Sequence, residues 1–184
     1  MRNNSVDRRA QRTRRDLMAA FIELVLSRGY TAVTTAEISR RANIGRSTFY
    51  LHYAGKEQLL QESLKHPSAG LAACVGGEVT AQQLLPLLEH FYSQRAVNRA
   101  FFESPIRQLW VASLAELIEP RLARTRTPAA QARIPRSLAA LVLAETQIAL
   151  VTHWLSGSAA VKAEAVADQL IGATRALLAG IATA

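Results

Sequence analysis

The sequence predicts an all-α protein, in which short helices near the amino terminus are followed by longer helices. Apolar residues recur at spacings of three and four along most of the chain, as in helices with one buried face. No segment shows the sustained alternation and turn signals that mark strands. With 184 residues, 49% of them hydrophobic, the chain is long enough to bury a substantial core.

The first predicted helix runs from about Arg9 to Arg28, with Leu17, Phe21 and Leu24 on one face. Gly29 follows at the position where helices commonly end in a left-handed residue. The next helix has the clearest start signal in the sequence. Thr34 and Glu37 have the spacing of a capping box, and Val33 and Ile38 have the spacing of a hydrophobic staple.

This second helix is predicted to end near Ala42, because Asn43 is among the few residues that tolerate a left-handed turn. A third short helix is expected from Arg46 to about His52. Ala54 and Gly55 interrupt it, and helical spacing resumes over 56–66 until Pro67.

At Pro67 the composition changes, which predicts one domain over residues 1–66 and a second over 67–184. The small-residue stretch 68–77 is interpreted as either a helix or a linker. Five further helices are expected: Thr80 to Ala96, Arg99 to Glu103, Pro105 to Thr125, Arg136 to Ser156, and Lys162 to Ala182.

The helix predicted over 136–156 is apolar nearly all round, which indicates burial on two sides. Either a second subunit or a single monomeric core would provide that burial. We favour a homodimer, since two-fold pairing is the commonest closed assembly. The candidate interface residues are Leu143, Leu150, Trp154, Leu170 and Leu177.

Charge is concentrated at the amino-terminal end of the chain. Of the 22 basic and 14 acidic residues, 12 basic and 6 acidic residues lie in 1–66. An arm over residues 1–15 holds six arginines against Asp7 alone. A basic end on a nearly balanced body predicts a polyanionic partner, either nucleic acid or an acidic membrane surface.

Several other classes are disfavoured by the sequence. The longest uncharged stretch, 146–161, is shorter than the roughly 20 residues of a membrane span. Cys74 is the single cysteine, which excludes a disulfide framework. Without paired histidines at ligand spacing, a glycine-rich phosphate loop or a base placed near Cys74, we expect no enzyme, no metal site and no cofactor.

Residues 34–53 have the pattern of a helix-turn-helix motif: a capped short helix, a tight turn and a second short helix. The apolar residues of this segment hold the two helices together, which leaves a polar set projecting from the second helix: Arg46, Ser47, Thr48, Tyr50 and His52. The start of such a helix is suited to the major groove of DNA.

This stretch resembles the tetracycline-repressor (TetR) family of bacterial transcriptional regulators. The resemblance covers residues 14–60 and is carried by RGY, TTAEIS, STFYLHY and GKEQLL at uninterrupted spacing. Asn43, Gly45 and Gly55 depart from the family pattern, and Gly45 removes a side-chain cap from the second short helix.

The resemblance implies phosphate contacts by Thr34 or Thr35, by Tyr50 and by Lys56, and a phosphate or base-edge contact by His52. We choose Arg46 for base readout, because a guanidinium can pair with guanine O6 and N7. The arginine arm, with Arg14 as its candidate contact, would reach the minor groove or follow the backbone.

The resemblance also implies a cytoplasmic homodimeric repressor that a small effector releases from a near-palindromic operator. Candidate residues for a mostly apolar effector pocket are Phe91, Phe102, Trp110, Thr146 and Gln147, although the same residues would serve as ordinary core. An alternative is a basic helical protein that binds lipid or a membrane surface with the same fold.

Overall fold

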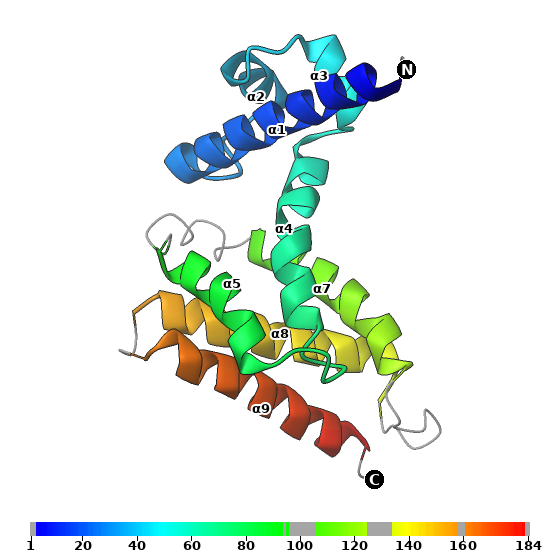
Figure 1. Cartoon of the computed structure of the whole chain (residues 1–184), viewed down its shortest axis with the longest axis vertical. Coiled ribbons are helices and arrows are strands. Elements are labelled where there is room, and N and C mark those ends of the chain that lie inside the picture. Colours follow the sequence, from blue (N-terminus) through cyan, green and yellow to red (C-terminus); the bar gives the residue numbers. More distant parts are fainter. Residues whose placement is uncertain (1–2, 94, 96–105, 125–133, 158–160, 183–184) are drawn as a thin grey trace. The chain divides into compact units, whose positions relative to one another are not determined.

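The computed structural model describes residues 3–93, 95, 106–124, 134–157 and 161–182 (Figure 1). Every regular element in these residues is an α-helix, which confirms the predicted all-α class. The chain divides into two compact units, Met1–Ser63 and Leu64–Ala184. The first unit carries the two short helices that the sequence predicts, together with a first helix of 26 residues, and the helices of the second unit are 13 to 20 residues long from α5 onward.

The amino-terminal unit contains α1 (Asn3–Arg28), α2 (Thr35–Arg41), α3 (Arg46–His52) and the start of α4 (Lys56–Ala72). The first three helices all pack against one another. Their core is formed by fully buried side chains from each helix: Leu17, Phe21, Ile38, Phe49, Tyr53 and Leu59. The bounds of α2 and α3 agree with the sequence prediction.

The structure starts the first helix earlier than the predicted Arg9, so that it includes most of the arginine-rich arm. Helix α1 begins at Asn3 and continues without a break through Arg15. The segment contains neither proline nor glycine, and arginine is a good helix former, so the helix extends through it. Arg8, Arg9, Arg12 and Arg14 are therefore placed along a helix.

The structure also corrects the predicted helix end at Pro67, because α4 continues to Ala72 with Pro67 inside it. Packing explains the continuation. Ser68, Leu71 and Ala72 are all fully buried, so this turn is stabilised by the core of the carboxy-terminal unit. At Gly70 an added Cβ would lie 2.9 Å from a Leu87 methyl carbon, which shows that the small residues permit close helix packing.

The remaining helices are α5 (Ala81–Ser93), α7 (Ile106–Leu122), α8 (Arg136–Leu155) and α9 (Ala163–Ala182). In this unit α8 packs against α7 and α9, and α9 also packs against α5 (Figure 1). These spans lie close to those predicted. The helix expected over 99–103 and the predicted ends at Ala96, Pro105 and Thr125 fall outside the described residues.

Helix α8 is the central element of the carboxy-terminal unit. Its 20 residues are long and apolar enough to cross a membrane by length and composition, but half of the apolar window is buried inside the protein. Ala140, Leu143, Ala144, Ile148 and Val151 are fully buried. These features are those of a core helix of the bundle.

Candidate functional site

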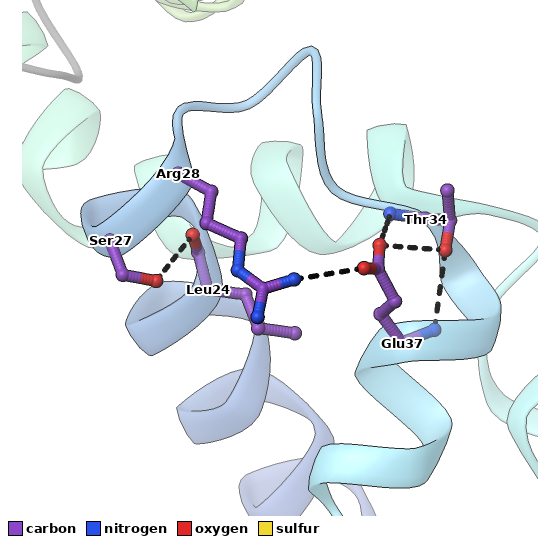
Figure 2. A network of polar contacts seen from close by, with 5 residues as sticks. All are labelled: Leu24, Ser27, Arg28, Thr34 and Glu37. Atoms are coloured by element: carbon purple, nitrogen blue, oxygen red, sulfur yellow. Dashed lines mark hydrogen bonds and ion pairs between the residues drawn. The ribbon is translucent and has the colours of Figure 1, made fainter.

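The start of α2 is held by a complete capping box (Figure 2). The Thr34 hydroxyl accepts a 3.3 Å hydrogen bond from the Glu37 amide, and the Thr34 amide donates to Glu37 Oε2 at 3.0 Å. Arg28, from the end of α1, donates to Glu37 Oε1 at 3.0 Å. The Thr34 side chain and amide lower the pKa of the Glu37 carboxyl.

The turn between α2 and α3 has the geometry that its sequence predicts. Asn43 has φ of +55°, and the Ile44 amide donates to the Ser39 carbonyl at 2.9 Å. Gly45 is the N-cap of α3 and supplies no side-chain hydrogen bond. The first amides of α3 therefore lack a covering side chain, as expected from the glycine at this position.

Helix α3 has two distinct faces. Phe49 is buried, as is Tyr53 at the C-cap, and the two rings are in contact at 6.1 Å between centroids. The opposite face exposes Arg46, Ser47 and Tyr50, and a further exposed residue, Leu51, lies beside them. Of the other predicted contacts, Thr48 and His52 are half-buried at the edges of this face.

Tyr50 links α3 to the start of α2. Its phenol oxygen lies 3.2 Å from the Thr35 hydroxyl, so these two predicted phosphate contacts are brought together. Hydrogen bonds from Thr35 and then from Arg46 lower the pKa of Tyr50. The predicted residues Thr35, Arg46 and Tyr50 thus form one polar cluster, whereas the Thr34 side chain is engaged with Glu37.

Several arginines of the amino-terminal unit are held in ion pairs. Arg28 pairs with Glu37, Arg41 pairs with Glu23, and Arg14 pairs with Glu62 at 2.9 Å. Arg14 also lies over the Tyr53 ring, so its guanidinium connects α1 to α4. Within the described part of the chain, Arg46 is exposed and forms no ion pair, which leaves its charge available to a ligand.

The Lys56 ammonium is bound by the loop that joins α1 to α2. It donates to the carbonyls of Tyr30 at 2.9 Å, Thr31 at 3.5 Å and Val33 at 2.8 Å. It also lies 4.5 Å from the centre of the Tyr30 ring. Burial, followed by the nearby Glu57 carboxylate, raises the pKa of Tyr30 to about 12. A phosphate contact by Lys56 would compete with these carbonyls.

The residues predicted for an effector pocket that the structure describes make contacts within the carboxy-terminal unit. Phe91 and Trp110 are buried and meet edge to face, and the Trp110 indole donates to Ser68 at 3.0 Å. Gln147 is also buried and donates to Thr174 of α9 at 3.0 Å. Thr146 donates to the backbone of its own helix, at Val142. Phe102 lies outside the described residues.

An open groove of about 590 Å³ is found elsewhere in the carboxy-terminal unit, at the ends of α5 and α8 and the start of α9. Tyr92 and Trp154 stack in its wall with ring centres 5.3 Å apart. Glu89, Lys162 and Glu164 supply charged groups to the lining. Sequence reasoning missed this groove, because its residues come from three separate helix ends.

The predicted dimer residues differ in exposure. Leu143, Trp154 and Leu170 are buried within the chain, so their side chains present almost no surface to a second copy. Leu150 and Leu177 are half-buried. An apolar stripe that remains exposed lies instead along α8, and its members are Leu138, Leu141 and Val142. Among the described residues of α8, this stripe is the apolar surface that the monomer leaves exposed.

Potential metal ligands and the single cysteine are located in the residues that the structure describes. No group of three or more His, Cys, Asp or Glu side chains there could hold a metal ion. Cys74 is buried, and burial raises the pKa of its thiol to about 11, which disfavours the reactive thiolate.

A capped short helix, a tight turn and a second short helix with an exposed polar face define a helix-turn-helix protein. The model of the family described as "Bacterial regulatory proteins, tetR family" matches residues 17–63, which include the whole motif. This segment therefore matches the DNA-binding region of the TetR family of bacterial transcriptional regulators.

A curated relative, the uncharacterized HTH-type transcriptional regulator YxbF of Bacillus subtilis (strain 168), is 41% identical over 69 residues. These residues are 37% of this chain, and the match spans only 18% of the length of that relative. The resemblance to that protein is therefore confined to one segment.

Solved structures match over nearly the whole chain. A TetR transcriptional regulator from Streptococcus agalactiae 2603V is 27% identical, with a TM-score of 0.59, over 94% of this chain and 99% of that one. FadR of Thermus thermophilus, a TetR-family repressor solved in complex with lauroyl-CoA, is 22% identical. Its TM-score is 0.57, over 91% of this chain and 94% of that one. The similar proteins are transcriptional regulators rather than enzymes.

Proposed function

We propose that this chain binds double-stranded operator DNA through the exposed face of α3 and regulates transcription as a homodimer. The observation that carries the proposal is the contrast between the two faces of α3. Phe49 and Tyr53 anchor the helix, while Arg46, Ser47 and Tyr50 face solvent. A short helix fixed on one face and polar on the other is suited to the major groove.

Two kinds of contact are expected on this face. Arg46 carries a charge that no carboxylate in the described residues neutralises, so it can pair with a guanine edge. Thr35 and Tyr50 hold hydroxyls close together at the junction of α2 and α3, which suits a phosphate oxygen. Ser47, Thr48 and His52 complete the expected contact surface.

A homodimer would present two copies of α3, and its two-fold symmetry would require a near-palindromic operator. The exposed stripe at Leu138, Leu141 and Val142 of α8 supports such an assembly, because contiguous exposed apolar surface favours association. Because TetR-family proteins are commonly repressors, we infer that this protein represses transcription in the bacterial cytoplasm while bound to DNA of the nucleoid.

Release by a small, mostly apolar effector is part of the proposal. A relative of this fold binds lauroyl-CoA. In this chain the groove walled by Tyr92 and Trp154 offers apolar surface with charged groups at its edge. A mostly apolar cavity with a few polar groups suits small-molecule binding.

The test is selection of the purified full-length protein from random duplex DNA, followed by footprinting of the enriched sequence and of the DNA that flanks its own gene. The wild-type protein should enrich a near-palindromic site. Arg46→Ala should relax preference at one base position in each half-site, by about 1–3 kcal/mol. Arg40→Ala, which removes the same charge from an exposed position on α2, should leave the preferred sequence unchanged.

Failure of the wild-type protein to enrich or protect any duplex would contradict the proposal. Binding to anionic lipid vesicles in that case would support the lipid-binding alternative. An unchanged preference in Arg46→Ala would remove only the assignment of base readout to Arg46.

A further inference from the structure

Leu51 is the most exposed large apolar side chain in the part of the chain that the structure describes. It is 82% exposed, whereas the next such residue, its neighbour Tyr50, is 52% exposed. Single exposed apolar residues are common on protein surfaces, so exposure alone assigns no role. Leu51 lies on α3, the helix proposed to bind DNA, so its exposed side chain is available to a DNA base.

Leu51 lies on α3, beside the exposed polar residues and away from the anchoring side chains. It follows Ser47 by four residues, the spacing of neighbours on one helix face. Phe49 and Tyr53 fill the core of the unit, and Leu51 takes no part in that packing. The helix therefore presents one row that begins at Arg46 and includes Tyr50, and a second row that contains Ser47 and Leu51.

The chemistry of the major groove limits what Leu51 can contact. Base edges there present hydrogen-bond donors and acceptors, and the 5-methyl group of thymine is the apolar group among them. A leucine placed against a phosphate or a polar base edge would desolvate that group without replacing its hydrogen bonds. Against a methyl group, the same side chain buries apolar surface on both partners.

We propose that Leu51 is a specificity-determining residue that contacts the 5-methyl group of one thymine in each half-site. This inference rests on the proposed function, since it requires α3 to enter the major groove. Leu51 adds preference for thymine without adding charge. Its loss therefore changes sequence preference and leaves the salt dependence of binding unaltered.

The test measures binding of the full-length protein to its selected duplex, with each thymine replaced in turn by deoxyuridine, which lacks only the 5-methyl group. At one thymine per half-site, the replacement should weaken wild-type binding about fourfold, as expected for loss of one methyl-sized contact. Leu51→Ala removes the contact from both half-sites, so it should weaken binding to the thymine duplex about as much as deoxyuridine at both positions together, roughly 16-fold. Deoxyuridine at that position should then cost the variant nothing further.

Controls separate this contact from a general loss of folding. Leu51→Met keeps an apolar side chain and should keep the deoxyuridine penalty. Leu51→Ala should leave the unfolding midpoint unchanged, because the side chain is 82% exposed. Penalties at other thymines should be equal in the wild-type and variant proteins.

Equal deoxyuridine penalties at every position in wild type and Leu51→Ala would overturn this inference, while the proposed function would stand because the wild-type protein still selects a sequence. A variant that binds all duplexes more weakly with the same preferences would also overturn it. Failure of the wild-type protein to bind any duplex would overturn the proposed function and this inference together.

Discussion

At the scale of single residues, Thr34 has a structural role that its sequence context predicted. Both halves of the capping box are present, and Arg28 adds an ion pair to Glu37. These bonds engage the Thr34 hydroxyl, whereas the neighbouring Thr35 hydroxyl lies against Tyr50. The two adjacent threonines therefore differ in what they do, which the sequence left open.

Thr34→Ala should destabilise α2 by about 1 kcal/mol, because the variant leaves a helix amide without its acceptor. Hydrogen exchange of the α2 amides in the full-length protein measures this local stability. Thr35→Ala is the matched control, since it removes an equivalent hydroxyl from the next position and leaves the capping box intact. Equal protection of the α2 amides in both variants would contradict the capping role.

The residues that sequence reasoning assigned correctly are those whose partners are close in the chain. Asn43 adopts the left-handed conformation, and Gly29 ends α1 with φ of +77°. Leu51 was not singled out, because a leucine in a helical pattern is ordinarily expected to be buried. Its exposure depends on how α3 is rotated against α1 and α2.

At the scale of elements, Lys56 shows how α4 is joined to the rest of the amino-terminal unit. A positive charge at a helix start is unfavourable with respect to the helix dipole. Here the three carbonyls of the loop at Tyr30, Thr31 and Val33 surround the ammonium and offset that effect. These partners lie more than 20 residues away in sequence, so spacing alone could not identify them.

Lys56→Met keeps the alkyl chain but loses every hydrogen bond to the carbonyls of the loop between α1 and α2. The variant should therefore make this loop more mobile, and the mobile loop should weaken DNA binding. The amides of residues 31–33 should exchange faster, and the salt dependence of DNA binding should keep its slope. A direct phosphate contact would instead reduce the slope by about one unit.

Lys65→Met provides the control for Lys56→Met, since it removes the same charge from an exposed position of α4. It should change neither exchange of the loop nor the preferred DNA sequence. A reduced slope for Lys56→Met with unchanged loop exchange would restore the phosphate contact that the family resemblance implies.

Helix α4 also shows why element boundaries were the least certain part of the sequence prediction. Proline usually ends a helix because it lacks an amide donor and crowds the preceding turn. In α4 the burial of Ser68 and Leu71, together with the close approach of Leu87 to Gly70, outweighs that cost. Tertiary packing thus overrides a correct local rule.

At the scale of the whole molecule, the proposed homodimer depends on apolar surface that the chain leaves exposed. Helix α8 buries one side in its own unit and exposes Leu138, Leu141 and Val142. Sequence periodicity identified α8 as apolar on two sides, but it could not tell which residues the monomer already covers. Only the packing of α7 and α9 against α8 separates the two sets.

The 184-residue chain should scatter light as a species of about twice its 20.1 kDa mass, because pairing of the α8 stripe removes apolar surface from water. Leu141→Lys should shift this mass toward that of the monomer. Gln82→Lys, which adds the same charge to an exposed position of α5, should leave it unchanged. A monomer mass at every concentration would contradict the dimer.

The sequence by itself determined the helical class, the capping box, the turn at Asn43 and the bounds of the two short helices. These features depend on residues within a few positions of one another, so local physical chemistry is sufficient to specify them. The tertiary structure decided the continuation of α4 through Pro67, the binding of Lys56 by a distant loop, and the exposure of Leu51. Each of these depends on groups that come together only when the helices pack.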